Sequence, residues 1–206
     1  MGVSPLRLRF VQSASRADQL PADIAEIAFV GRSNVGKSSL INTLANQRQL
    51  AQVSNTPGRT RLINLFALDL PGTPSGSGKA TTALVDLPGY GYAAVGRQQK
   101  AGWRAMIEGY LQHRDGLRCV FVLVDAEIGP TKLDLQMLEW LHAIQVPYAL
   151  VGTKVDKVKA SRLGLRKGEL ARSCGLEPDD VVWVSASTGK GIDALRTRVV
   201  ELLRAG

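Results

Sequence analysis

The sequence predicts a single α/β domain in which a doubly wound, mostly parallel sheet of six strands carries helices on both faces. Stretches typical of strands alternate along the chain with longer helical patterns, which is the order expected of a parallel sheet. The run Leu117–Asp125 is almost entirely apolar, as in a strand that is covered on both faces. A chain of 206 residues is long enough for one sizeable core and does not require a second domain.

Each expected strand is an apolar run bounded by turn-forming residues. The six strands are expected over Glu26–Val30, Leu62–Leu70, Thr82–Leu87, Leu117–Asp125, Pro147–Gly152 and Asp180–Val184. The second and third flank Pro71–Lys79, which is rich in Pro, Gly and Ser and is typical of a hairpin connection. One strand of the sheet is therefore expected to run antiparallel to the others.

The helices are predicted from apolar residues at helical spacing. In the last of them, Ile192, Leu195, Val199 and Leu202 fall on one face. Helices are expected over Ser38–Asn46, from about Gly96 to about His113, and over Thr131–Ile144, Ser161–Cys174 and Gly191–Leu203. Residues 1–24 are expected to form an extension that packs on the domain, which spans residues 25–206.

Composition excludes several classes of protein. With 45% hydrophobic residues and only 2 Cys and 2 His, the chain is neither disordered nor a disulfide scaffold, and a His/Cys metal cluster is not expected. The two cysteines form no C-x-x-C pair, so reduced thiols and a cytoplasmic protein are expected. The longest apolar run, Cys119–Val124, is far too short to span a membrane. The net charge of +8 favours an anionic partner, either nucleic acid or, with less support, a membrane surface.

Residues Gly31–Ser38 match the phosphate-binding pattern G-x-x-x-x-G-K-[ST]. The match follows an expected strand and opens an expected helix, which is the context that this loop requires. Its glycines let backbone N–H groups approach phosphate oxygens, and the helix N-terminus adds partial positive charge. Lys37 is expected to contact the outer phosphates, and the Ser38 hydroxyl is expected to bind Mg²⁺.

The segment Asp86–Gly89 is a D-x-x-G element at the end of an expected strand. Its aspartate is expected to hold a water on Mg²⁺, and the Gly89 N–H is expected to sense a γ-phosphate. Between this element and the phosphate loop, a polar loop holds Thr56 and Thr60. Either threonine is a candidate to close over Mg²⁺ and the γ-phosphate.

Two further segments favour guanine over adenine. Thr153–Asp156 follows a buried strand, and Ser185–Ser187 follows the last strand. The Asp156 carboxylate can accept hydrogen bonds from N1–H and the exocyclic amine of guanine, which adenine does not offer. The stem of Lys154 is expected to pack on the base, and the Ala186 N–H is expected to donate to guanine O6. These segments favour a GTP-binding protein over a P-loop kinase or ATPase.

Taken together, the phrases EIAFVGRSNVGKSSLIN, SNTPGRT, DLPGYGYA, TKVD and VSAS closely resemble the EngB family, also called YihA or YsxC, of the TrmE-Era-EngA-EngB-Septin-like GTPase superfamily. The resemblance runs from about Phe10 to the C-terminus. It implies a Ras-like, six-stranded P-loop GTPase domain that binds GTP or GDP together with Mg²⁺. It also implies a role in assembly of the bacterial large ribosomal subunit and a link to cell division and septation.

The resemblance also implies the roles of the site residues. It favours Thr60 over Thr56 as the switch threonine, so the expected catalytic residues are Lys37, Thr60 and Gly89. Ser38 and Thr60 are the expected Mg²⁺ ligands, with Asp86 supporting the ion through water. The residues expected at the nucleotide are Gly31, Arg32, Ser33, Asn34, Val35, Gly36, Lys37, Ser38, Ser39, Gly58, Arg59, Thr60, Arg61, Leu62, Asp86, Leu87, Pro88, Gly89, Thr153, Lys154, Val155, Asp156, Ser185, Ala186 and Ser187.

Three positions bear on affinity and rate. Thr153 stands where Asn is usual, so one hydroxyl braces the phosphate loop in place of an amide. Tyr90 stands where Ras-like enzymes carry a water-orienting Gln, so slow intrinsic hydrolysis is predicted. Stimulation by a partner is also expected, and in other GTPases such stimulation raises the hydrolysis rate by a factor of ~10³–10⁵. Asn34 stands where potassium-activated GTPases place a K⁺ ligand, so K⁺ is a candidate cofactor in place of an arginine finger. The alternative is that Asn34 only shapes the loop.

Clusters of basic residues favour contact with ribosomal RNA phosphates, with solvated helix faces as the alternative. No RNA-binding module or row of stacking aromatics is present in the sequence, so neither base-specific readout nor DNA specificity is expected. The clusters are Arg97, Lys100 and Arg104 near Trp103; Lys157, Lys159, Arg162, Arg166, Lys167 and Arg172 around the helix before last; and Arg7 and Arg9 near the N-terminus.

The sequence therefore predicts a GTPase, a monomer by default, that hydrolyses GTP slowly to GDP and phosphate with water as the nucleophile. The γ-phosphate is expected to order Gly58–Thr60 and Asp86–Gly96 into a surface that the large ribosomal subunit or its precursor recognises through rRNA phosphates and ribosomal proteins. Two alternatives stay open: a nucleotide-dependent adaptor at the division site, and a small-molecule kinase.

Overall fold

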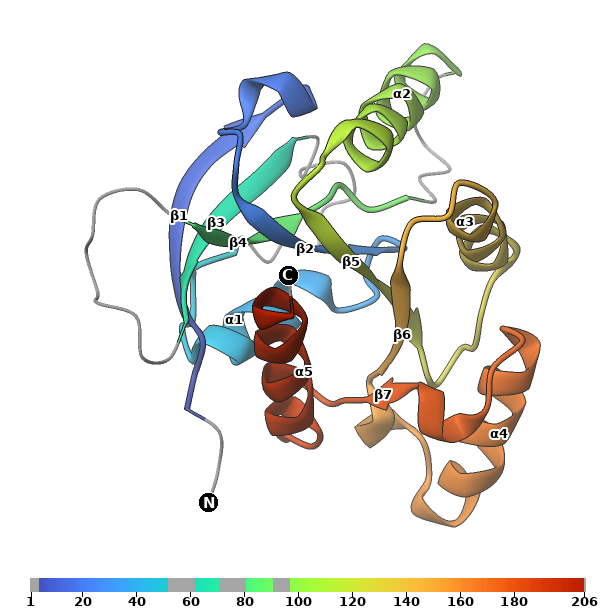
Figure 1. The fold of residues 1–206 in the computed structure, drawn as a ribbon. Helices are drawn as coiled ribbons and strands as arrows, with labels where there is room; N and C mark the ends of the chain where they lie inside the picture. The colour runs from blue at the N-terminus through green and yellow to red at the C-terminus, as the bar shows by residue number, and fades with distance from the viewer. Residues whose placement is uncertain (1–3, 52–61, 71–80, 91–96, 206) are drawn as a thin grey trace.

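The computed structural model describes residues 4–51, 62–70, 81–90 and 97–205. Within these residues seven strands form one sheet in the order β1-β3-β4-β2-β5-β6-β7 (Figure 1). Strand β3 is antiparallel to both of its neighbours, and every other neighbouring pair is parallel, which confirms a mostly parallel sheet with one antiparallel strand. The strands are β1 (Arg7–Ala14), β2 (Ala25–Gly31), β3 (Ile63–Asp69), β4 (Thr82–Asp86), β5 (Leu117–Asp125), β6 (Tyr148–Thr153) and β7 (Val182–Trp183).

The prediction of six strands is wrong by one, because β1 was not expected. This strand pairs antiparallel with β3 and forms one edge of the sheet. Only Leu8 and Ala14 of its residues are buried, while Arg7 and Arg9 are exposed. An edge strand that buries so few side chains lacks the apolar run by which the other strands were recognised. At the opposite edge, the strand expected over Asp180–Val184 shortens to β7.

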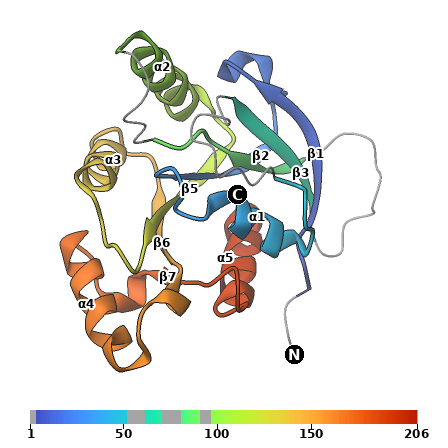
Figure 2. The same ribbon diagram turned by 180° about the vertical axis from the view of Figure 1, so that it is seen from behind.

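Five α-helices are described, each close to its predicted bounds: α1 (Lys37–Ala45), α2 (Arg97–His113), α3 (Lys132–Ala143), α4 (Leu163–Ser173) and α5 (Ile192–Arg204). Short 3₁₀ turns in the described residues are η1 (Ala17–Gln19), η2 (Val155–Lys157), η3 (Ala160–Arg162) and η4 (Pro178–Asp180). Helices α1 and α5 pack on one face of the sheet, and α2, α3 and α4 pack on the other (Figures 1 and 2). None of the helices in the described part of the chain is both long and apolar enough to cross a bilayer.

Strand β2 shows why the central strands read as continuous apolar runs. Its side chains alternate between the two faces, so Ile27 and Phe29 join the core beneath α1 and α5, while Ala28 and Val30 join the core beneath α2 and α3. All four are 0% exposed. A strand covered on both faces has no polar side to alternate with. Because β2 lies at the centre of the sheet, the loop that follows it is held from both sides.

A buried arginine fixes helix α1, which begins at the phosphate loop. Arg196 of α5 is 9% exposed, and its guanidinium donates to the carbonyl oxygens of Leu44 at 3.0 Å and Thr43 at 2.9 Å. Both carbonyls lie in the last turn of α1, where they also accept from the backbone N–H groups of Asn46 at 3.1 Å and Leu6 at 2.9 Å. The contact ties α1 to α5 and holds the position of the loop at the other end of α1.

Candidate nucleotide-binding site

The predicted phosphate loop is the turn that joins β2 to α1. Asn34 and Gly36 both take left-handed backbone conformations, with φ of 64° and 99°, and Gly36 is the N-cap of α1. A side chain at Gly36 would be strained by this φ, which explains the second glycine of the motif. Val35 is 1% exposed and anchors the middle of the loop in the core. The turn therefore presents the first N–H groups of α1, which have no intrahelical acceptor, to a phosphate.

The predicted Lys37 and Asp86 meet at the start of α1. They form a buried ion pair, in which Lys37 is 8% and Asp86 2% exposed. Strands β2 and β4 are parallel neighbours with Phe29 opposite Asp86, so both residues emerge at the same edge of the sheet. A pair of charges so deeply buried is stable only while both partners are present. The lysine is therefore held at the mouth of the loop.

The D-x-x-G element packs directly on the phosphate loop. A Cβ built on Gly89 would lie 3.2 Å from the Gly31 carbonyl oxygen and 3.3 Å from the Ser33 nitrogen, which is tighter than an ordinary side-chain contact. The backbone of Tyr90 continues this contact: its N–H donates to Gly31 O at 3.2 Å, and its carbonyl accepts from the Ser33 N–H at 3.0 Å. A side chain at position 89 would therefore displace one of these closely packed backbones by a few tenths of an ångström.

The first two residues of Thr153–Asp156 hold the phosphate loop from the other side. The Thr153 hydroxyl donates to the Val35 carbonyl at 2.8 Å, which agrees with the brace expected from the sequence. Lys154 Nζ donates to the Asn34 carbonyl at 2.7 Å, so the lysine stem crosses the loop. These contacts join β6 to the turn after β2 and explain how a segment more than a hundred residues away in the sequence shapes the loop.

Asp125 is a site residue that was missed from the sequence. It ends β5 and is 2% exposed, and one carboxylate oxygen accepts from Lys154 Nζ at 2.7 Å. Its other oxygen accepts from the N–H groups of Glu127 at 2.9 Å and Ile128 at 3.3 Å. Asp125 therefore orients the lysine over the loop. The available signal was an aspartate at the end of a buried strand, the same position that Asp86 occupies on β4.

The structure also brings together the residues predicted to recognise the base, Asp156, Ser185 and Ser187. The Ser187 hydroxyl donates to Asp156 at 2.9 Å, and the hydroxyls of Ser185 and Ser187 lie 3.0 Å apart. The hydroxyls of Ser185 and Ser187 lower the pKa of Asp156, so its carboxylate stays ionised as a hydrogen-bond acceptor. The Ala186 carbonyl accepts from the Thr43 hydroxyl at 3.2 Å, which ties this segment to α1.

The structure does not describe every predicted site residue. Thr56 and the segment from Gly58 through Arg59 and Thr60 to Arg61 lie outside the described residues. Leu62, at the border of that segment, is 40% exposed. The residues that the structure brings to the phosphate loop or to the Asp156 segment by a described contact include Gly31, Ser33, Asn34, Val35, Lys37, Asp86, Gly89, Thr153, Lys154, Asp156, Ser185, Ala186 and Ser187.

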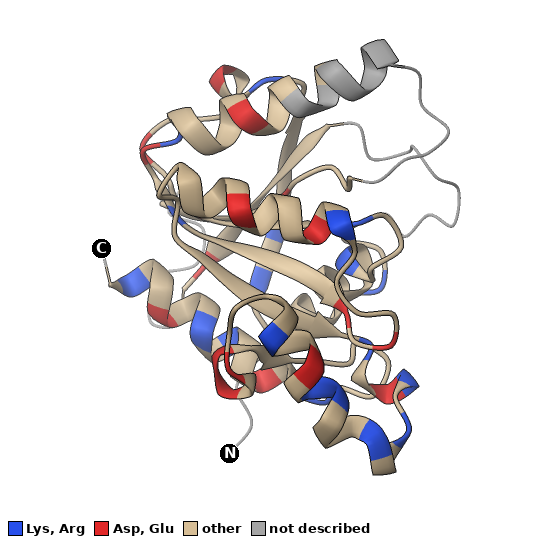
Figure 3. Cartoon of the chain, turned by 90° about the vertical axis from the view of Figure 1, so that its right-hand side faces the viewer, with Lys and Arg blue, Asp and Glu red and all other residues tan. Residues whose placement is uncertain are grey.

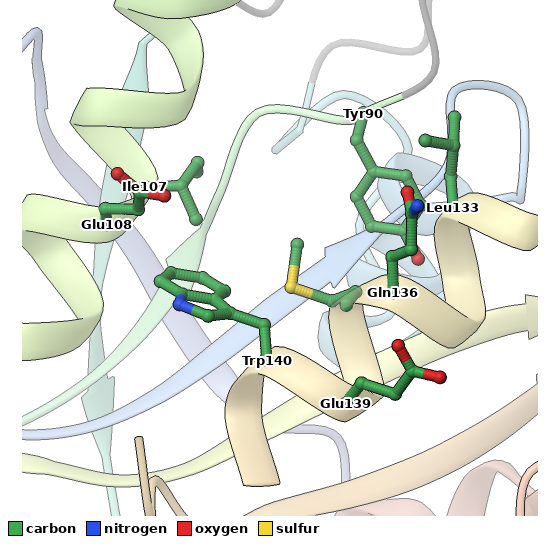
Figure 4. Close-up of a pocket in the computed structure, with 8 residues that line it drawn as sticks. Tyr90, Ile107, Glu108, Leu133, Gln136, Glu139 and Trp140 are labelled. Carbon is green, nitrogen blue, oxygen red and sulfur yellow. The ribbon is translucent and has the colours of Figure 1, made fainter. Parts of the chain in front are cut away.

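The Tyr90 side chain points away from the phosphate loop. Its ring lies against α3, beside a groove of about 530 Å³ between α2 and α3 that Ile107, Met137 and Trp140 also line (Figure 4). The hydroxyl donates to Asp134 of α3 at 2.6 Å. Burial and the Asp134 carboxylate raise the pKa of this hydroxyl well above its usual range, so it remains a donor. The side chain is therefore used in a contact inside the protein.

Basic residues gather around α4 (Figure 3), and their side-chain contacts divide them into two parts. Arg166 donates to the carbonyls of Ala126 at 2.9 Å and Glu127 at 3.0 Å, and Lys167 lies 5.2 Å from the ring centre of Trp183. These two cations have structural contacts. The cations that remain exposed are Lys157, Lys159, Arg162 and Arg172. The side chains of Arg97, Lys100, Trp103 and Arg104 lie outside the described part of α2.

A P-loop protein that selects guanine nucleotides is the class that this fold and these contacts define, and comparison with known proteins agrees. The model of the 50S ribosome-binding GTPase family matches residues 26–154. A probable GTP-binding protein EngB of Geobacter sulfurreducens is 42% identical over 198 residues, which are 96% of this chain and 91% of that protein. A probable GTP-binding protein EngB of Clostridium perfringens is 45% identical over 188 residues, 90% of each chain. The chain therefore belongs to the EngB family of GTP-binding proteins.

Solved structures share the fold at lower sequence identity. A crystal structure of a probable GTP-binding protein EngB has a TM-score of 0.67 and 21% identity, and the match covers 88% of this chain and all 100% of that one. Era in complex with MgGDPNP and nucleotides 1506–1542 of 16S ribosomal RNA has a TM-score of 0.67 and 23% identity, over 88% of this chain and 57% of Era. These matches support a Ras-like P-loop GTPase fold.

Proposed function

We propose that this chain is a Mg²⁺-dependent GTPase with slow intrinsic hydrolysis, which acts as a nucleotide-dependent switch in assembly of the bacterial large ribosomal subunit. The observation that carries the proposal is that the phosphate loop contacts both the γ-phosphate-sensing element and the guanine-selecting segment. Tyr90 pairs with Gly31 and Ser33 on one side, and Thr153 and Lys154 contact the loop on the other. Such a loop can couple the identity of the base to the state of the phosphates.

The proposed chemistry is electrostatic. Lys37 and the first N–H groups of α1 stabilise negative charge on the phosphates, and the Gly89 N–H contacts the γ-phosphate. Water is the proposed nucleophile. The Tyr90 hydroxyl is bonded to Asp134, away from the loop, so this side chain does not orient the attacking water as a Gln would. Slow intrinsic hydrolysis is the proposed consequence.

The residues at the start of α1 fit Mg²⁺. This ion prefers oxygen ligands. Ser38, the residue after Lys37 in α1, carries a hydroxyl, and Lys37 itself is paired with the buried Asp86 carboxylate. We propose that Ser38 holds the ion directly, that Asp86 holds it through water, and that Thr60, outside the described residues, is the second protein ligand. When bound, Mg²⁺ neutralises charge on the phosphate oxygens.

A ribosomal partner is supported by charge and by family. The net charge is +8, and the exposed Lys157, Lys159 and Arg162 follow directly after Asp156. Cations that contact rRNA phosphates would release counterions and bind with steep salt dependence. The matching family is described as 50S ribosome-binding GTPases. We further propose a cytoplasmic monomer that is needed for normal cell division and septation.

Co-sedimentation with purified 30S and 50S particles tests the proposal. The protein is loaded with GDP or a non-hydrolysable GTP analogue, at low and moderate salt. Selective binding to 50S with the GTP analogue supports the proposal. Equal binding to both particles in both states, lost as salt rises, contradicts it and favours the septal adaptor.

A charge-matched pair of variants tests the surface. Replacing Lys157, Lys159 and Arg162 by Ala is expected to lower 50S binding and flatten its salt dependence. Replacing three exposed cations elsewhere, Arg48, Arg118 and Lys132, removes the same charge and is expected to have a smaller effect. An equal effect of both triple variants contradicts a specific surface on η2 and η3.

A further inference from the structure

Gly89 and Tyr90 are held at the phosphate loop by two independent sets of contacts. The first set is the backbone pairing, in which the Tyr90 N–H donates to Gly31 O and its carbonyl accepts from the Ser33 N–H and, at 3.3 Å, from the Ser33 hydroxyl. These bonds set the distance between Gly89 and the loop. Among the described residues, the pairing of these two backbone segments is an isolated bridge between Arg32 and Tyr90.

The second set begins at the Tyr90 side chain. The ring is 4% exposed, and its hydroxyl donates to Asp134 Oδ1 at 2.6 Å. Asp134 is 1% exposed and occupies the first turn of α3. Its other oxygen accepts from the N–H and the hydroxyl of Thr131, each at 2.7 Å, in a capping box. The tyrosine is thereby anchored to a rigid helix terminus.

The strength of this anchor follows from its chemistry. A phenol that donates to an ionised carboxylate makes a charge-assisted bond, and the low dielectric of a buried position strengthens it. Burial, together with the Asp134 carboxylate, raises the pKa of the Tyr90 hydroxyl, so the donor proton persists throughout the physiological range. Loss of the hydroxyl would leave a buried carboxylate oxygen without its partner.

We propose that Tyr90 is a positioning residue, whose hydrogen bond to Asp134 fixes the adjacent Gly89 N–H at the phosphate loop in the position that reads a γ-phosphate. The inference rests on the proposed GTPase function. It assigns to the tyrosine a role different from that of a water-orienting Gln: the side chain acts through the backbone of its neighbour. GTP and GDP differ only in the γ-phosphate, so the contact must affect one nucleotide more than the other.

The test compares two phenylalanine variants. Tyr90→Phe keeps the ring and removes the hydroxyl. Tyr110→Phe is the matched control, because Tyr110 is 0% exposed and donates to the buried Glu26 carboxylate at 2.7 Å, on α2 and β2 and away from the loop. Both variants lose one buried phenol–carboxylate bond, so a comparable loss of thermal stability is expected. Only the first should alter discrimination between nucleotides.

Dissociation constants for GDP and a non-hydrolysable GTP analogue give the readout. In Y90F the analogue is expected to bind about tenfold more weakly relative to GDP, a change equivalent to about 1.4 kcal/mol, with a lower kcat. In Y110F the ratio is expected to stay at the wild-type value. Equal ratios in Y90F, Y110F and wild type overturn the inference. A wild-type protein that binds neither guanine nucleotide overturns the proposed function instead.

A double-mutant cycle adds a second, independent readout. Asp134→Asn leaves one carbonyl oxygen for the donors of both Tyr90 and Thr131, so the bond to Tyr90 is weakened and the ratio is expected to lie between those of wild type and Y90F. If the two residues act through one hydrogen bond, the double variant Y90F/D134N has the ratio of Y90F alone. An additive fall in the ratio contradicts the proposed link. Thermal melting of each variant verifies that it is folded before its ratio enters the cycle.

Discussion

Asp125→Asn tests the way in which Lys154 is held over the phosphate loop. The two carboxylate oxygens of Asp125 have separate tasks: Oδ2 accepts from Lys154 Nζ, and Oδ1 accepts from the N–H groups of Glu127 and Ile128. An asparagine can keep its carbonyl oxygen toward the two backbone donors. Its NH₂ group then faces the lysine ammonium and cannot accept. The substitution therefore breaks one link and preserves the turn after β5.

The expected magnitude follows from burial and charge. A hydrogen bond to a charged group contributes about 1.5–3 kcal/mol when it is buried. The Lys154 side chain is 33% exposed, which screens the pair and lowers the expected value to about 1–2 kcal/mol. That range corresponds to a rise of about 5- to 30-fold in the dissociation constant. GDP and GTP should be affected alike, because the Lys154 contact with the Asn34 carbonyl and its proposed contact with the guanine base would be common to both nucleotides.

Equilibrium titration with a fluorescent GDP provides the assay, and thermal melting verifies that the variant is folded. Glu127→Gln is the matched control: it removes the same charge two residues away at an exposed position. The control is expected to bind GDP as the wild type does. If D125N binds GDP within about twofold of the wild type, the pair with Asp125 does not position Lys154. If E127Q weakens binding as much as D125N, a general loss of negative charge is responsible.

Three further predictions concern the same site. Thr153→Val removes the brace on the Val35 carbonyl and is expected to raise the Kd for both nucleotides about three- to tenfold, measured by the same titration; an unchanged Kd would show that the hydroxyl is dispensable. Ser187→Ala removes a hydroxyl that lowers the pKa of Asp156, so the loss of GDP binding on acidification should begin at a higher pH than in the wild type, and coincident pH profiles would contradict this. GTP hydrolysis should be faster in KCl than in NaCl if Asn34 contributes to a K⁺ site, whereas equal rates would leave Asn34 only a structural role in the loop, where its φ is 64°.

The sign of the pH prediction follows from the direction of the pKa shift. The folded protein holds the pKa of Asp156 below its usual value, so the carboxylate is ionised over a wider acid range than an unperturbed aspartate. Guanine recognition needs the ionised form, because only that form accepts from both donors of the base. A higher pKa of Asp156 therefore means that GDP binding is lost at a higher pH on acidification. Protonation of GDP itself affects the wild type and the variant equally, so it cancels when their pH profiles are compared.

Much of the fold was predictable because its signals are local. The central strands are apolar on both faces, and the five helices carry their apolar residues at helical spacing, so each element is visible in its own residues. Strand β1 was not visible, because at the edge of the sheet it buries few side chains and depends on β3 for its backbone partners. Pairing between distant segments leaves no local pattern.

The same distinction applies to the site. The chemistry of the phosphate loop is contained in the consecutive residues Gly31–Ser38, so the sequence by itself identified the groups that are proposed to meet a phosphate. Only the tertiary structure decided which residues hold those groups in place. The register of the sheet sets Asp125 opposite Thr153, and this brings the carboxylate within reach of Lys154.

Two other assignments also required the fold. Packing of α3 against the segment after β4 turns the Tyr90 hydroxyl toward Asp134, and packing of α4 against the loop after β5 engages Arg166 in backbone hydrogen bonds. From the sequence, Tyr90 was interpreted only as a replacement for the water-orienting Gln, and Arg166 was one of several candidate RNA contacts. Residue type determines which interactions a side chain can make. The arrangement of elements in space determines which partner it finds, because residues 40 or more positions apart meet only through the folded sheet and its helices.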